Sequence, residues 1–181
     1  NAVNLRDFAT HKHNRVDDVP YGGGAGMVIM PAVVHAAIES LADEPGELIY
    51  LSPRGKVLDQ ALVRSYTSAP GVKLLCGRYE GVDQRVLDHH KVTEVSVGDY
   101  VLSGGELAAM ILLDACVRLL PSVMGNVDSG QDESFESGLL EYPHYTRPAE
   151  WQGRAVPPGR QAGHHAQSDA GRTNQAETIT Q

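Results

Sequence analysis

The sequence predicts an α/β fold with a largely parallel sheet. Three observations support this: short apolar runs alternate with segments of helical periodicity, each run has the length of a strand, and glycine or proline follows each run. Such alternation is typical of parallel strands connected by helices. Because ligands bind these sheets beyond the carboxyl ends of the strands, the loops after the strands are the first candidate sites.

The apolar runs predict three strands, at residues 48–51, 72–76 and 92–97. We expect them to end at three loops, which begin at Ser52, Gly77 and Gly98. Glycine in such loops lets the backbone approach a ligand closely. Helical patterns are expected at residues 31–41, 58–65 and 83–89.

The clearest helical pattern runs from Glu106 to Leu120. Residues 103–106 have the S-x-x-E form of a capping box, which predicts Ser103 as the N-cap. Apolar residues cover most of the circumference, so this helix is expected to be buried in a core or against a second subunit. Asp114 and Arg118 are spaced to form a surface ion pair, which alone would contribute little.

Composition narrows the class of protein. The chain has 181 residues, and 41% of them are hydrophobic, as in an ordinary globular protein. No apolar run of about 18 residues predicts a membrane span, and no signal peptide is evident. Cys76 and Cys116 each lie in an apolar stretch, which favours reduced thiols in a cytoplasmic protein. The net charge of −8 argues against nucleic acid unless lysines and arginines gather locally.

The histidines predict no metal site. His11 and His13, His89 and His90, and His164 and His165 are close pairs, but none has a third ligand at a recognisable spacing.

Several motifs have both a structural and a functional interpretation. The glycine-rich residues 21–27 lack the Lys-Ser/Thr of a phosphate-binding P-loop, so they form either a plain loop or one that grips substrate by its backbone. Residues 76–83 follow a strand and open a helix that Asp83 would cap, but capping leaves Arg78, Tyr79 and Glu80 unexplained. Asp132 and Glu133, in a long polar loop, would by default be solvated carboxylates.

In their order along the chain, these motifs resemble one family, the bacterial tRNA (guanine-N1)-methyltransferases. The matching stretches are RDFATHKHNRVDDVPYGGGAGM, IYLSPRG, CGRYEGVDQRV, SVGDYVLSGGEL and SGLLEYPHYTRP, which together run from about Leu5 to Pro148. The resemblance implies a SPOUT-type deep trefoil knot around the mainly parallel sheet. It also implies a homodimer in the cytoplasm that methylates N1 of the guanine at position 37 of tRNA, 3′ of the anticodon.

The resemblance implies that three loops bind S-adenosyl-L-methionine. By position, its binding residues are Tyr50, Leu51, Ser52, Pro53 and Gly55 in the first loop; Gly77, Tyr79, Glu80 and Gly81 in the second; and Val97, Gly98, Asp99, Tyr100, Val101, Leu102, Gly104 and Gly105 in the third. These are the same loops that the strand pattern marks as ligand-competent. Mg²⁺ is a further cofactor that the resemblance suggests, although the sequence shows no ligand cluster for it.

The chemistry requires a base and a cation. Guanine N1 carries a proton, so a carboxylate must remove it before N1 can accept a methyl group. The negative charge that then grows on O6 is stabilised by a fixed cation. By position in the family, these groups are Glu133 and Arg118. The family usually has E-D-S where this chain has Asp132-Glu133-Ser134, so Asp132 is the alternative base.

The same residues leave other functions open. A knotted methyltransferase that acts on a ribose 2′-hydroxyl would need no carboxylate at the base edge. A fragment that binds cofactor or RNA without turnover is a third interpretation, because family members begin with a strand and helix that this chain lacks. We expect the methyltransferase domain at residues 1–153. Residues 154–181 would be a linker and the truncated start of a small helical, tRNA-binding C-terminal domain.

Overall fold

The computed structural model describes residues 1–123, 135, 140–158 and 175–180. The chain divides into two compact units, Asn1–Val123 and Met124–Gln181. Among the described residues, no helix has the length and apolarity that crossing a membrane requires.

The first unit is built around a three-stranded parallel sheet. Its strands are β3 (Glu47–Val57), β4 (Val72–Leu75) and β5 (Thr93–Ser96), in the order β4-β3-β5. The helices are α1 (Pro31–Glu39), α2 (Gln60–Ser68), α3 (Gln84–His89) and α4 (Gly105–Val117). The expected α/β class and parallel sheet are therefore confirmed.

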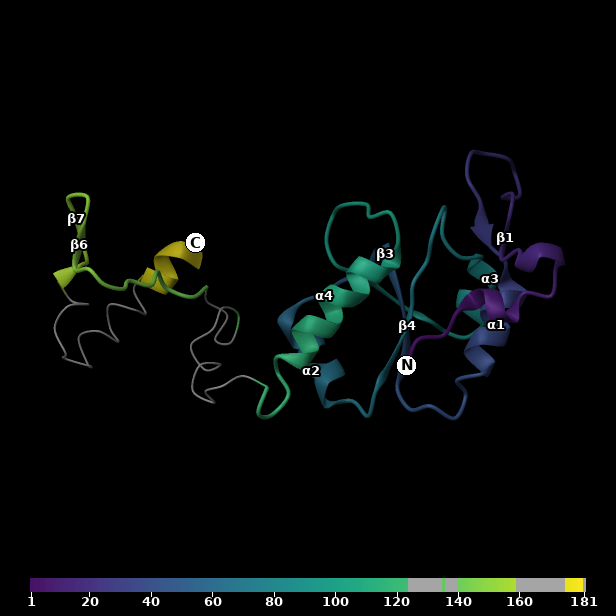
Figure 1. Cartoon of the computed structure of the whole chain (residues 1–181), viewed down its shortest axis with the longest axis horizontal. Coiled ribbons are helices and arrows are strands. Elements are labelled where there is room, and N and C mark those ends of the chain that lie inside the picture. Colours follow the sequence, from purple (N-terminus) through teal and green to yellow (C-terminus); the bar gives the residue numbers. More distant parts are fainter. Residues whose placement is uncertain (124–134, 136–139, 159–174, 181) are drawn as a thin grey trace. The chain divides into compact units, whose positions relative to one another are not determined.

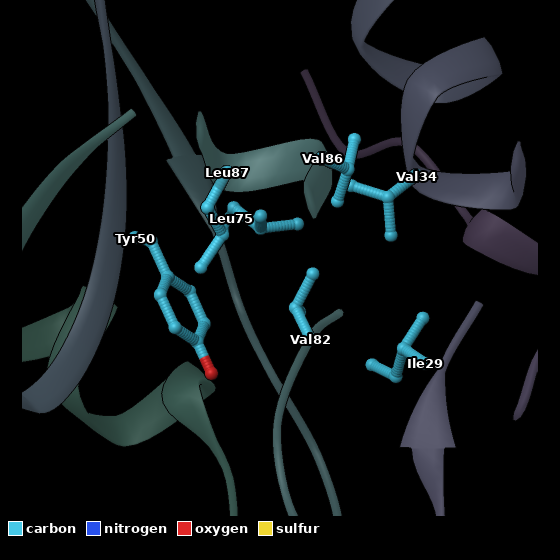
Figure 2. Close-up of a cluster of buried hydrophobic side chains, with 7 residues drawn as sticks. All are labelled: Ile29, Val34, Tyr50, Leu75, Val82, Val86 and Leu87. Atoms are coloured by element: carbon cyan, nitrogen blue, oxygen red, sulfur yellow. The ribbon is translucent and has the colours of Figure 1, made fainter. Parts of the chain in front are cut away.

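Alternation along β3 places helices on both faces of this sheet. Ile49 and Leu51 pack in one cluster with residues of α2 and α4, whereas Tyr50 packs in another with residues of α1 and α3. Successive side chains of a strand point to opposite faces, so a continuous apolar run can serve two cores. Figure 1 shows α2 and α4 on one side of the strands and α1 and α3 on the other, and Figure 2 shows the second cluster around Tyr50.

Short elements complete the first unit. Two 3-10 helices, Leu5–Phe8 and Lys12–Asn14, precede an antiparallel pair formed by β1 (Asp17–Asp18) and β2 (Val28–Ile29). The glycine-rich loop of residues 21–27 joins these two strands.

The second unit contains an antiparallel pair, β6 (Glu150–Trp151) and β7 (Arg154–Ala155). The residues between these strands, Gln152 and Gly153, both have positive φ, which suits the tight turn of a two-residue hairpin. Residues 175–180 are helical, and Thr180 Oγ1 accepts a hydrogen bond of 2.9 Å from the backbone N–H of Leu140.

Two local predictions were wrong. The first strand was expected to end at Ser52, but β3 continues to Val57. Its pairing with β5 shifts register between Leu51 and Lys56, both of which lie opposite Val95, so residues 52–55 form a bulge within the strand. Ser103 was expected to cap α4, but the N-cap is Gly104, whose extended backbone leads directly into the helix.

Candidate functional site

Three loops at the carboxyl edge of the sheet contribute to the lining of one open cavity of about 1020 Å³. They are the bulge in β3, the loop between β4 and α3, and the loop between β5 and α4. All but two of the sequence-predicted binding residues line this cavity: Tyr50, Leu51, Ser52, Pro53, Gly77, Tyr79, Glu80, Gly81, Val97, Gly98, Tyr100, Val101, Leu102, Gly104 and Gly105. The volume is at the upper end of that typical for small-molecule sites.

Glycines keep the second and third loops close together. A Cβ on Gly77 would lie 2.8 Å from Tyr50 Oη, and one on Gly105 would lie 2.8 Å from Cys76 Cα. The Gly105 N–H donates a 2.9 Å hydrogen bond to the Gly77 carbonyl, and Arg78 forms a β-bridge with Gly104. These contacts explain why α4 begins at Gly104–Gly105, because a neighbouring loop, rather than the Ser103 hydroxyl, satisfies this N–H.

An ion pair at the surface connects the second loop to the start of α4, directly after the third loop. Arg78 Nε donates to Glu106 Oε1 at 2.9 Å, and each side chain is about half exposed. The pKa of Glu106 is lowered, first by the hydrogen bond from its own backbone N–H at the start of α4 and then by Arg78. This pair carries little energy, but it ties the third loop to the second.

The helix that follows the second loop begins as the sequence predicts. Asp83 is the N-cap of α3 and accepts from the backbone N–H of Arg85. The Arg85 guanidinium also donates to Asp83, and this hydrogen bond is the main reason that the pKa of Asp83 is lowered. Arg54 from the bulge of β3 donates to Gln84 at 3.0 Å and to Glu94 at 3.2 Å. Charged groups therefore fix the relative positions of the loops around the rim.

The cavity lining also contains uncharged groups, among them Tyr50, Ser96 and Tyr100. Burial raises the pKa of Tyr50, so its phenol stays neutral at physiological pH. The Ser96 hydroxyl is buried and donates to the Gly98 carbonyl at 3.1 Å, while the Tyr100 hydroxyl donates to the Val97 carbonyl at 3.1 Å. These bonds hold the third loop, and they leave a surface of backbone amides, apolar side chains and aromatic rings that suits a ligand with a flat ring and polar edges.

Comparison with known proteins gives the family. The model of the tRNA (Guanine-1)-methyltransferase TrmD family matches residues 1–181. The chain belongs to this family. It is 62% identical over 180 residues to the tRNA (guanine-N(1)-)-methyltransferase of Rhodospirillum rubrum, with 99% of this chain and 75% of that protein covered. Two proteins of the same name, from Rhizorhabdus wittichii and Ruegeria pomeroyi, are each 55% identical, with 98% of this chain and 73% and 74% of their own lengths covered.

Two residues that the family resemblance placed in the cofactor site lie outside the cavity lining: Gly55 and Asp99. Gly55 has a packing role, because a Cβ there would lie 2.3 Å from the backbone nitrogen of Val95. It allows the bulge of β3 to pass close to β5. Asp99 is next to two lining residues, Gly98 and Tyr100, in the same loop.

Arg118, the cation expected to act on the base, is not among the residues that line this cavity. Arg118 is the C-cap of α4, and Gly104 and Gly105 are at the opposite end of that helix. A helix of 13 residues is about 20 Å long, so Arg118 is far from the loops of its own chain. Asp132 and Glu133 lie outside the described residues.

The cavity also has a wall that the sequence did not assign to a ligand. Residues 18–21 and 28–32, on either side of the glycine-rich loop, line it. This segment is joined to the second loop, because Ile29 forms a bridge with Val82 and the Glu80 N–H donates to the Met27 carbonyl at 3.0 Å. The glycine-rich motif is visible in the sequence. The contact of its flanks with the cavity is not, because it depends on pairing between residues more than 50 positions apart.

Proposed function

We propose that this chain transfers a methyl group from S-adenosyl-L-methionine to N1 of the guanine at position 37 of tRNA. The observation that supports the proposal most is the meeting of three strand-end loops around one cavity in a member of the tRNA (Guanine-1)-methyltransferase TrmD family. The relatives described above are named tRNA (guanine-N(1)-)-methyltransferases, which supports the tRNA substrate and the N1 atom of guanine.

Two features of the cavity support its assignment to the methyl donor: its volume and its glycine-rich lining. Gly77 and Gly81 line the cavity without side chains, so their backbone is available to a ligand. Both positions are restricted to glycine, because a Cβ on either would fall within 3 Å of the Tyr50 hydroxyl. We assign the lining residues of the three loops to S-adenosylmethionine, with Gly55 supporting the first loop from behind. When bound, this cofactor supplies the electrophilic methyl group.

The chain's own residues would then prepare the guanine. We propose that Glu133 takes the N1 proton, with Asp132 as the alternative because the order of these residues differs from that usual in the family. Proton removal by a positioned carboxylate typically contributes about 10²–10⁴-fold. Arg118 would stabilise the negative charge that develops on O6 as the proton leaves.

The position of Arg118 favours action across a homodimer. The arginine lies a helix length from the cavity of its own chain, so in our proposal it serves the cavity of a second copy. Leu107, Met110, Ile111 and Leu113 of α4 are all substantially exposed, while Ala108 and Leu112 are buried in the chain's own core. An exposed apolar helix face of this kind is typical of a surface that another subunit covers.

Three further features complete the proposal. The bridge between Arg78 and Gly104 is compatible with the second and third loops being threaded as a deep trefoil knot. Residues 1–153 would form the methyltransferase domain, and residues 154–181 the linker and start of a tRNA-binding domain. The two free cysteines suit the reducing cytoplasm.

The direct test is methyl transfer from labelled S-adenosylmethionine to two tRNA transcripts that differ only in carrying guanine or adenine 3′ of the anticodon. We expect transfer to the guanine transcript alone, and a loss of about 10²-fold or more in Glu133→Gln. Labelling of both transcripts would point instead to a ribose hydroxyl. Parallel reactions with Mg²⁺ and with EDTA determine whether the metal is needed.

A mixing experiment tests the role of the dimer. At an S-adenosylmethionine concentration well below the dissociation constant of the Gly77→Ala variant, that variant and Arg118→Ala are each expected to be nearly inactive. If Arg118 serves its partner's cavity, a mixed dimer has one site with both parts intact, so equal mixing should restore about a quarter of wild-type activity by random pairing. If Arg118 acts within its own chain, neither site is complete and no activity returns.

A further inference from the structure

One histidine of α1 and two consecutive histidines at the end of α3 meet where these two helices pack together. His35 lies on α1, His89 is the last residue of α3, and His90 is its C-cap. His35 Nδ1 and His90 Nε2 are 2.8 Å apart, and one ring nitrogen of each histidine lies within 4.8 Å of the others. We propose that these three side chains bind a transition-metal cation, with Zn²⁺ as the ion best suited to them, and that the ion links α1 to α3.

The distances suit metal coordination. Two nitrogens at 2.8 Å share a proton, as in any hydrogen bond between imidazoles. In a tetrahedral zinc site each nitrogen lies about 2.0–2.1 Å from the ion, which places the nitrogens about 3.3 Å from one another. Replacing the proton by Zn²⁺ therefore requires the pair to separate by only about half an ångström, and the His89 nitrogen, which lies within 4.8 Å of the other two, to approach by at most about 1.5 Å.

The backbone around His89 and His90 is held in place before any ion arrives. The Lys91 N–H bonds to the Asp88 carbonyl at 3.2 Å, and the Val92 N–H bonds to the Leu87 carbonyl at 3.0 Å. Lys91 has φ of 50°. Together these features form a Schellman motif, which gives the end of α3 a defined geometry. On α1, the residue before His35 is Val34, which belongs to the same core cluster as Val86 of α3 (Figure 2), so the two helices are packed together beside the histidines.

The protonation state also favours binding. Burial lowers the pKa of His90, and the neighbouring imidazoles of His89 and His35 lower it further. The neutral imidazole, which is the form that binds a metal, is therefore the prevalent form of His90 at neutral pH.

Glu39 can orient one of the ligands. It lies one turn after His35 on α1, and its Oε1 is 4.0 Å from His90 Nδ1, the nitrogen that faces away from His35. Metal-bound histidines commonly donate their second N–H to a carboxylate, which fixes the ring and makes it a better ligand. Glu39 is thus a positioning residue, and it helps to assign Nε2 of His90 as the ligand atom.

The site is separate from the cavity. The first residues of α1 and α3, Pro31 and Gln84, line the cavity, whereas the histidines lie one or more turns farther along the same helices. An ion held there would stabilise the packing of the two helices behind the cavity wall without touching its ligand.

The test is Zn²⁺ binding to the whole chain without an affinity tag, measured by equilibrium dialysis and by competition with a chelator of known affinity. We expect His35→Gln, His89→Gln and His90→Gln each to weaken the binding of one Zn²⁺ per chain by at least about 10-fold. Glu39→Gln should weaken it less than the loss of a ligand, by at most about 10-fold, because Glu39 Oε1 is 4.0 Å from His90 Nδ1, beyond hydrogen-bond distance. His144→Gln is the matched control, because His144 is exposed and pairs with Glu141 outside the cluster, and its Zn²⁺ affinity should be unchanged.

A second measurement separates loss of a ligand from loss of folding. His35 and His89 are exposed, so their variants should keep the far-ultraviolet circular dichroism of the parent chain. Co²⁺ bound in place of Zn²⁺ should give visible absorption of a tetrahedral ion in the parent and in His144→Gln, and not in His35→Gln. Failure of the parent to bind Zn²⁺, or equal affinity in the parent and all three histidine variants, would overturn the proposal. Neither result would bear on methyl transfer.

Discussion

Two glycine-rich regions of the first unit differ in what surrounds them. In the strand-end loops, a Cβ on Gly55, Gly77 or Gly105 would come within 3 Å of other atoms, and for Gly55 and Gly105 those atoms are backbone. At Gly22, Gly23 and Gly24 nothing lies within 4 Å, and all three have positive φ. Gly55, Gly77 and Gly105 are therefore needed for space, and Gly22, Gly23 and Gly24 for backbone conformation. Gly26, in the same loop as the second set, has both constraints, because its φ is positive and a Cβ there would meet the Glu80 side chain.

This difference separates two properties that a run of glycines does not distinguish in a sequence. Where space is limiting, an added methyl group acts on the neighbouring strand or loop, so its effect should spread to the sheet and the cavity. Where conformation is limiting, the effect stays local and is bounded by the cost of left-handed backbone, which is about 1–2 kcal/mol for an L residue.

The largest effect is expected for Gly55→Ala. The new methyl group would meet the backbone of Glu94 and Val95 at 2.3–2.6 Å, and a backbone strand cannot rotate out of the way. Overpacking of this kind typically costs about 1–3 kcal/mol, and we expect the free energy of unfolding in urea to fall by about 3 kcal/mol. Because Gly55 does not line the cavity, the folded fraction should keep its S-adenosylmethionine affinity. A weakened affinity at unchanged stability would show that Gly55 contacts the ligand.

Gly77→Ala should act mainly on the ligand. Its methyl group would meet the ring and hydroxyl of Tyr50, a side chain that can shift, so stability should change less than in Gly55→Ala. Displacing Tyr50 into the cavity should weaken S-adenosylmethionine binding by about 10- to 100-fold, or about 1.4–2.7 kcal/mol, by calorimetry. Adding Tyr50→Phe removes the atom that is nearest, 2.8 Å away, and should restore part of the affinity. If the two changes are simply additive, the hydroxyl contact is not the cause, and the contact with the ring carbon Cε2, 2.9 Å from the added Cβ, is left to account for the loss.

Gly22→Ala and Gly23→Ala are expected to be mild. No atom would be displaced, and the cost is that of holding alanine at φ of 86° or 79°, about 1 kcal/mol or less if the exposed loop relaxes. Urea unfolding of both variants, beside Gly55→Ala, measures the comparison directly. A loss as large as that of Gly55→Ala would mean that the loop packs against something that the single chain does not contain.

The sequence predicted the strands of the sheet better than the points at which a strand ends or a helix begins. The alternating elements, the parallel strands and the Asp83 cap follow from local patterns, and the structure contains them. The continuation of β3 through Pro53 does not follow from a local pattern. Proline has no N–H and is excluded from a regular strand ladder, but a bulge tolerates it. The start of α4 also depends on a distant group, the Gly77 carbonyl. In both places a tertiary contact outweighs the local signal.

The candidate site shows the same limit. Most cavity residues could be assigned by resemblance, since the loops are continuous motifs. The wall of residues 18–21 and 28–32 and the cluster of His35 with His89 and His90 could not, because each arises when segments about 50 residues apart pack together. Pairs of histidines were visible in the sequence, but the residue that completes the cluster lies on another helix.

The smallest effect is expected for the ion pair that joins the second and third loops. At neutral pH, Glu106→Gln should lower the free energy of unfolding by at most about 1 kcal/mol, because both partners are about half exposed. The folded pKa of Glu106 is lowered, so the stabilisation is present above the unfolded pKa and is lost as the pH falls through the folded value. Urea titrations of the parent and variant between neutral pH and about pH 3 should therefore converge at the acid end, below the ordinary glutamate pKa of about 4.3. A gap that persists there would show that packing of the side chain, rather than its charge, stabilises the loop beside Gly104.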